Sequence, residues 1–170
     1  MKIALCTVIV KQTALAQGGR AASLAKAGDA TAKRLLAADA EHQRTVEEVR
    51  RALRRRKITF AESSLAGLDS RLKGQLAISD LIITVGGDGT ALGASHYIRG
   101  GALLGVNSAP GDSVGHFCSV NRKNFAARLD EILSGKWKRC VIRWFSLGAS
   151  VLAQIWIKLL TTQPNAMFGP

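Results

Sequence analysis

A chain of 170 residues is long enough for one ordinary domain, or for one domain and part of a second. Its apolar content of 47% can fill a packed core and its charged content of 21% is too low for a disordered chain, while only 5% of its residues are aromatic. We therefore expect a folded protein with a core of Leu, Ile, Val and Ala, whose formal net charge of +12 raises the question of an anionic partner.

The cysteines and the start of the chain bear on its compartment. Cys6, Cys118 and Cys140 are three in number and widely spaced, so they form neither a disulfide framework nor a paired metal motif. Lys11 and polar residues follow the first apolar run too soon for a cleaved export signal. These features predict a reduced, cytoplasmic protein.

The first third of the chain predicts a strand, a loop and a long helix. Residues 3–10 are apolar and β-branched, as in a buried strand, and residues 14–28 are small and polar, as in a loop. Asp29 is a candidate N-cap for a helix that runs to about Arg56. Residues 58–60 are a candidate second strand.

Basic residues gather at the predicted end of this helix: Arg50, Arg51, Arg54, Arg55, Arg56 and Lys57. Cations at a helix C-terminus interact favourably with the helix dipole, so a solvated helix end explains the cluster without any partner. The alternatives are the binding of nucleotides and a nonspecific attraction of nucleic acid. We expect no specific recognition of nucleic acid.

The middle of the chain alternates strands with helices. Residues 81–85 form an uninterrupted apolar run, as expected for a strand that is covered on both faces. A helix over 90–98, a strand over 102–106 and a helix over 124–133 follow. This alternation predicts an α/β domain with a mainly parallel sheet and flanking helices.

The end of the chain has a different composition. After Arg143 the only charged residue is Lys158. The uncharged run over 144–157 is shorter than the roughly 20 residues of a membrane-spanning helix, so we expect no membrane anchor. We divide the chain into an α/β nucleotide-binding domain, residues 1–136, and the start or remnant of a β-rich second domain, residues 137–170.

Three glycines follow the strand over 81–85, namely Gly86, Gly87 and Gly89. Glycine lets backbone N–H groups approach phosphate oxygens, and the carboxyl end of a strand is where such a sheet binds its ligand. A tight turn alone explains one glycine, whereas three favour ligand binding. The chain contains no Walker A motif, and the spacing to Gly93 is one residue too long for a dinucleotide fingerprint.

Asp88 lies within this glycine turn. A carboxylate there repels phosphate unless it accepts the proton of an attacking hydroxyl or holds a Mg²⁺ ion that bridges phosphates. Both roles belong to phosphoryl transfer. The alternative is a structural one, in which the carboxylate hydrogen-bonds its own backbone in an Asx turn.

The segment Asp80–Thr90 resembles the GGDGT motif of NAD kinases, which diacylglycerol kinases and phosphofructokinases share more loosely. Residues 104–108 and 113–117 resemble the second glycine-bearing loop of that family, in the branch where the loop ends in a Gly-x-x-Cys pattern, here Gly115 to Cys118. The resemblance covers roughly residues 1–143 and is strongest over 79–120.

The resemblance implies ATP-dependent phosphorylation of the 2′-hydroxyl on the adenosine ribose of NAD, with Mg²⁺ or another divalent cation as cofactor. Asp88 would be the catalytic base. The residues that it assigns to the binding of NAD and ATP are Gly86, Gly87, Gly89, Thr90, Asn107 and Ser108, and it assigns no residue as a metal ligand. Family members often assemble through their second domain, so the resemblance leaves homo-oligomerisation open.

One departure from the family pattern concerns the second domain. There the family carries an Asn-Glu or Asn-Asp pair that grips NAD, and neither dipeptide occurs in this sequence. We therefore expect little or no kinase activity from this polypeptide alone. A lipid kinase that shares the glycine turn and a non-catalytic nucleotide or nucleic-acid binding module are the alternative functions. The choice of ATP or polyphosphate as donor, and of NAD or NADH as acceptor, stays open.

Overall fold

A computed structural model describes residues 2–16, 23, 27–67, 69–111, 115–118, 120–136, 139–144 and 155–160, the last two ranges as backbone only. The strands are β1 (Cys6–Val10), β2 (Phe60–Ser63), β3 (Leu81–Gly86), β4 (Ala102–Asn107), β5 (Val120–Asn121), β6 (Arg139–Trp144) and β7 (Ile155–Leu160). The helices are α2 (Ala30–Arg55), α3 (Ser70–Ile78), α4 (Asp88–Ser95) and α5 (Phe125–Leu133), with a 3₁₀ turn at Leu65–Gly67.

The strands form one sheet in the order β2-β1-β3-β4-β7-β6, and β5 pairs with β4 off this path. Strands β1 to β5 pair in parallel, and β7 is parallel to β4 through Leu103 and Leu159, while β6 is antiparallel to β7. The predicted α/β fold with a mainly parallel sheet and flanking helices is confirmed.

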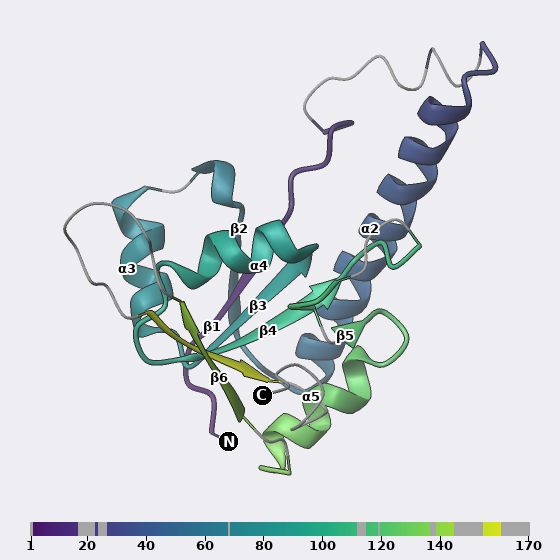
Figure 1. Cartoon of the computed structure of the whole chain (residues 1–170). Coiled ribbons are helices and arrows are strands. Elements are labelled where there is room, and N and C mark those ends of the chain that lie inside the picture. The colour runs from purple at the N-terminus through teal and green to yellow at the C-terminus, as the bar shows by residue number, and fades with distance from the viewer. Residues whose placement is uncertain are drawn as a thin grey trace, which may run out of the picture.

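Helices α2 and α5 cover one face of the sheet, and α3 and α4 cover the other (Figure 1). Leu81 and Ile83 of β3 point into a cluster with α2 and α5, whereas Ile82 between them packs with α3 and α4 on the other face. This alternation is the period of two that any strand imposes on its side chains. Because both faces are covered, every residue of β3 and β4 is buried, and this explains why their sequences are uninterrupted apolar runs.

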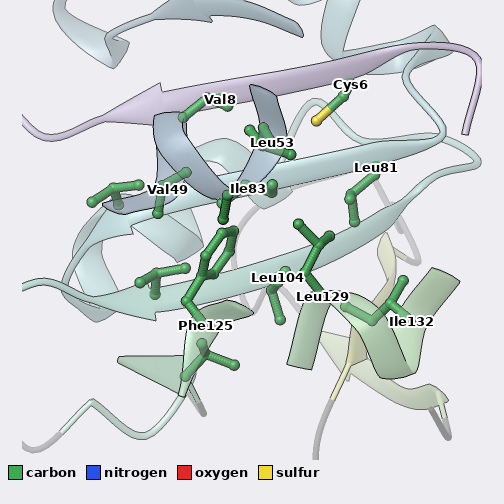
Figure 2. Close-up of a cluster of buried hydrophobic side chains, with 14 of the residues drawn as sticks. Cys6, Val8, Val49, Leu53, Leu81, Ile83, Leu104, Phe125, Leu129 and Ile132 are labelled. Carbon is green, nitrogen blue, oxygen red and sulfur yellow. The ribbon is translucent and has the colours of Figure 1, made fainter. Parts of the chain in front are cut away.

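The larger core cluster lies between the sheet and the helices α2 and α5 (Figure 2). Phe125 and Leu129 of α5 and Leu53 of α2 are fully buried there. Complete burial of one such side chain contributes about 1.5–3 kcal/mol. The cluster holds the long helix α2 across the sheet, and the amino-terminal half of α2 extends past the carboxyl ends of the strands (Figure 1).

Carboxylates fix the ends of three elements. Asp29 and Asp69 accept the N–H of the residue three positions on, which caps α2 and α3. Asp80, just before β3, accepts the N–H groups of Ala4 and Leu5 at 2.8 and 2.9 Å. These backbone hydrogen bonds hold the pKa of Asp80 below its ordinary value.

Several predicted boundaries were wrong. The first strand begins at Cys6 rather than Ile3, and the second covers Phe60–Ser63 rather than 58–60. The helix predicted over 90–98 begins two residues earlier, at Asp88, and ends at Ser95. Helix α3 and the short strand β5 were not predicted.

Some predictions lie partly or wholly outside the described residues. They are the predicted loop at 17–22 and 24–26, the loop segment over 112–114, and the division of the chain at residue 137 for all but strands β6 and β7. Within the described part of the chain, no helix has the length and apolar content needed to cross a membrane.

Candidate functional site

A cleft of about 390 Å³ opens at the carboxyl ends of β1, β3 and β4, beside the amino-terminal half of α2. The residues that line it are Lys11, Thr31, Arg34, Leu35, Ala38, Gly86, Gly87, Asn107, Ser108 and Ala109. This edge of a parallel sheet is where the fold class binds its ligands. The described lining contains two cationic side chains and no carboxylate, so the cleft favours an anionic ligand.

The backbone holds the strand ends together at this edge. The N–H of Lys11 donates to the carbonyl of Val85, and the N–H of Ser108 donates to the carbonyl of Gly86, both at 2.9 Å. Gly86 itself has no room for a side chain, because an added Cβ would lie 2.4 Å from Oγ1 of Thr90 and 3.0 Å from Cβ of Lys11. Glycine is therefore a packing requirement at position 86.

Helix α4 begins directly beside the cleft. Gly87 is its N-cap and makes no side-chain cap bond, and Asp88 is the first helical residue. The first N–H groups of a helix have no partner within it and carry the positive end of the helix dipole. Together with Lys11 and Arg34 in the lining of the cleft, this end of α4 provides the donors and charge that a phosphate group requires.

The carboxylate of Asp88 holds the loop that precedes β5. Its two oxygens accept the N–H groups of His116 and Phe117 at 2.9 and 2.8 Å. The thiol of Cys118 is a third hydrogen-bond partner of this carboxylate. An ionised carboxylate offers about four acceptor positions, so about one remains for a ligand. The bonds orient the carboxylate and couple the glycine turn to a loop 28 residues further along the chain. They are not the bonds of an Asx turn to its own backbone.

The same loop packs against Asn107. Gly115 has a φ of +67°, and a Cβ there would lie 2.5 Å from Nδ2 of Asn107. Both the positive φ and the close contact require glycine at this position. Asn107 in turn accepts the N–H of Ala109 through Oδ1, so it orders the chain that follows β4.

Burial sets the chemical state of Cys118, the cysteine at the site. It raises the pKa of the Cys118 thiol to about 12, and the nearby Asp88 carboxylate adds to this effect. A neutral, buried thiol is neither a nucleophile nor a metal ligand. Cys6, the first residue of β1, is likewise buried in the core, which raises its pKa to about 12.

Comparison with known proteins agrees with this geometry. Residues 72–137, which contain β3, the glycine turn, β4 and α5, match the ATP-NAD kinase N-terminal domain. This stretch of the chain is thus similar to the NAD kinase family. It is 42% identical to a protein named NADH kinase from Arabidopsis thaliana, over a stretch that covers 34% of this chain and 23% of that relative. It is 40% identical to a probable NADH kinase from Oryza sativa subsp. japonica, over 33% of this chain and 22% of the relative. The matched stretch thus spans less than a quarter of either relative.

The predicted site residues are only partly brought together by the fold. Gly86, Gly87, Asn107 and Ser108 line the cleft, and both Asn107 and Ser108 are buried, at 5% and 3% exposure. Asp88, Gly89 and Thr90 follow the lining glycines in α4 but do not line the cleft themselves. Their functional roles stay predictions.

Sequence analysis missed the part of the cleft that comes from distant elements. Lys11 follows β1 at the same sheet edge, so the rule that ligands bind at the carboxyl ends of strands could have identified it. Thr31 and Arg34 lie in the first turns of α2. Helical periodicity marks them only as polar positions, so no local signal could have placed them at the cleft.

Half of the basic cluster at the end of α2 is engaged in ion pairs. Arg50 binds Glu47 and Glu62, Arg51 binds Glu48, and Arg56 binds Asp130 at 2.6 Å. The last pair joins the end of α2 to α5. Half of the cluster is thus paired with carboxylates of the same domain, which supports the structural interpretation of these charges.

Proposed function

We propose that the chain acts in the ATP-dependent phosphorylation of the 2′-hydroxyl on the adenosine ribose of NAD or NADH. The observation that carries this proposal is the arrangement of the glycine turn, with Gly86 and Gly87 lining a cationic cleft and Asp88 next to them at the start of α4. The names of the two relatives favour NADH beside NAD as the acceptor.

The cleft suits the phosphates of the two nucleotides. Backbone N–H groups at the start of α4 would bind phosphate oxygens, and Lys11 and Arg34 would neutralise their charge. Phosphoryl transfer depends mainly on such positioning and charge stabilisation, since little covalent chemistry is left for the protein. Asn107 and Ser108, next to Gly86 at the end of β4, would border the dinucleotide.

Asp88 would take the proton of the ribose hydroxyl. Its carboxylate is oriented by two backbone N–H groups and by the thiol of Cys118, and about one acceptor position remains for the hydroxyl. A general base must lie within hydrogen-bond reach of the hydroxyl that it deprotonates. The clamp by His116 and Phe117 keeps the carboxylate in one orientation for that contact.

The expected Mg²⁺ ion fits these residues as a companion of ATP. The described residues contain no group of three or more His, Cys, Asp or Glu side chains that could hold a metal by themselves. Mg²⁺ usually binds through one or two carboxylates together with substrate phosphates and waters. Asp88 is the carboxylate within the glycine turn, so it is the side chain that would hold the ion. The bound ion would screen the negative charge of the phosphates.

The test is the transfer of labelled phosphate from ATP to NAD and, separately, to NADH in the presence of Mg²⁺. We expect a transfer that Asp88→Asn lowers by about 10²–10⁴-fold, because that is the usual contribution of a general base. The loss should fall on kcat rather than KM, since the substrate contacts remain. Asp130→Asn is the matched control, because Asp130 pairs with Arg56 away from the cleft.

Equal transfer by the wild type and Asp88→Asn would contradict the role of Asp88. Absence of transfer to either dinucleotide by the wild type, at saturating ATP and Mg²⁺, would contradict the proposal that this chain catalyses the reaction by itself. It would agree with the expectation that a chain without the Asn-Glu or Asn-Asp pair has little or no kinase activity. Transfer to a diacylglycerol in place of NAD and NADH would favour the lipid-kinase alternative.

A further inference from the structure

A smaller cavity of about 110 Å³ adjoins the cleft along α2, and we call it the annex. Its lining residues are Lys11, Thr13, Ala14, Leu15, Leu35, Ala38, Asp39, His42, Ser108 and Ala109. Five of these, Lys11, Leu35, Ala38, Ser108 and Ala109, also line the cleft, so the two spaces are continuous. A ligand that fills the cleft can therefore extend one end into the annex.

Two polar atoms in the annex have no partner within the described residues: Oδ1 of Asp39 and Nδ1 of His42. Both atoms are buried, and His42 as a whole is only 3% exposed. A buried polar atom without a hydrogen bond is costly, so native proteins rarely keep one without a water or ligand to satisfy it. The annex is roomy enough for either, since one water needs only about 10–15 Å³.

Both unpartnered atoms are hydrogen-bond acceptors. Burial lowers the pKa of His42, an effect that the nearby Asp39 partly opposes, so the ring is neutral near pH 7. The ring donates a hydrogen bond to the backbone of Lys11, and the nitrogen without a partner is then an acceptor. Asp39 and His42 are three residues apart on α2, so they lie side by side on one face of the helix.

We propose that the annex binds the NH₂ group of a nucleotide, which donates one hydrogen bond to Asp39 and one to His42. An NH₂ group carries two donors and therefore matches the two neighbouring acceptors. NAD has two such groups, the exocyclic amine of adenine and the carboxamide of nicotinamide, and ATP has the first. This inference rests on the proposed function for the identity of the ligand. It makes Asp39 and His42 of α2 the residues that select among nucleotides with and without this NH₂ group.

The experiment is calorimetric binding of NAD and of two analogues that each replace one NH₂ group by an acceptor. Nicotinamide hypoxanthine dinucleotide lacks the adenine amine, and nicotinic acid adenine dinucleotide lacks the carboxamide nitrogen. We expect the wild type to bind one of the two at least about 10-fold more weakly than NAD, because two buried acceptors then lose their donors. The analogue that is rejected identifies which end of NAD occupies the annex.

Two variants test whether the annex residues cause this selectivity. In His42→Ala the preference for NAD over the rejected analogue should fall by about 10-fold. In Asp39→Asn it should reverse, because the new amide donates to the acceptor that the analogue carries. A gain of binding cannot arise from misfolding, so this variant keeps the test decisive if His42→Ala fails to fold. His96→Ala is the matched control, because His96 lies at the far end of α4 from the cleft.

The outcomes separate this inference from the proposed function. Tight binding of NAD with equal affinity for both analogues, or an unchanged preference in Asp39→Asn, would overturn the annex and leave the kinase proposal standing. ATP and inosine triphosphate form a second pair of probes. If the chain does not bind NAD but binds ATP and inosine triphosphate with different affinities, and Asp39→Asn removes this difference, the annex is supported and NAD is contradicted as the phosphoryl acceptor. Binding of none of these nucleotides would contradict both.

Discussion

The glycine turn offers a sharp test, because two of its glycines differ in the space around them. A Cβ added at Gly86 would lie 2.4 Å from Oγ1 of Thr90 and 3.0 Å from Cβ of Lys11, whereas a Cβ added at Gly89 meets no atom within 4 Å. Gly86→Ala should therefore force Thr90 and the turn to shift, which typically costs about 1–3 kcal/mol. Gly89→Ala should be neutral or stabilise the fold by about 0.5 kcal/mol, because alanine favours the helix.

Thermal unfolding of the two variants beside the wild type measures this difference. For a chain of this length, each kcal/mol shifts the Tm by about 2–4 °C. Gly86→Ala should unfold about 2–12 °C earlier, and Gly89→Ala at the wild-type temperature or slightly above it. An unchanged Tm for Gly86→Ala, or a larger loss for Gly89→Ala, would refute the packing argument.

Nucleotide binding by the same variants separates packing from function. Phosphate oxygens that approach the start of α4 would meet the new methyl group of Gly89→Ala, so this variant should bind ATP more weakly although it is as stable as the wild type. Unchanged binding of ATP by a stable Gly89→Ala would contradict the predicted phosphate contact at Gly89.

Three further predictions concern the fold. Leu129→Ala should lower the free energy of unfolding by about 2–5 kcal/mol in a denaturant titration, because Leu129 is fully buried. Ile78→Ala is the control: its side chain is 73% exposed, so the free energy of unfolding should change by less than about 0.5 kcal/mol. Cys6 and Cys118 should resist a thiol reagent at pH 8 until the protein unfolds, since burial raises the pKa of each to about 12; peptide mapping of rapid labelling at either residue in the native protein would contradict their burial. The pKa of Asp80 in the folded protein lies below the ordinary 3.8, so its carboxylate should stabilise the fold above pH 3.8, and this stabilisation should be lost as the pH falls through the folded pKa. In Asp80→Asn the free energy of unfolding should therefore depend less on pH in this acid range. An unchanged pH dependence would contradict the role of Asp80.

The extent to which sequence predicted the fold depends on burial. The two central strands were predicted almost to the residue, because burial on both faces makes their sequences uninterrupted apolar runs. Helix α3 was missed because only Leu72 and Leu76 of its nine residues are buried, so its apolar periodicity is weak. Strand β5 has two residues and owes its existence to its pairing with β4, which no local pattern encodes.

In the candidate site, contiguous residues could be predicted from the sequence, whereas contacts between distant elements could not. The turn from Gly86 to Thr90 could be identified because its glycines and its acid are contiguous in sequence. The contact of Asp88 with His116 and Phe117 depends on how the loop before β5 folds back over α4. The annex around His42 likewise arises only when α2 crosses the strand ends, and His42 alone in a polar helix carries no signal.

The most direct test of the central claim is a titration of the ¹⁵N-labelled chain with NAD, followed by amide signals in NMR spectra. If the glycine turn and the end of β4 bind the dinucleotide, the amides of Gly86, Gly87, Asp88 and Ser108 should shift most. Shifts that gather at the opposite edge of the sheet, near Asp80 and the start of β4, or no shifts at all, would contradict the account.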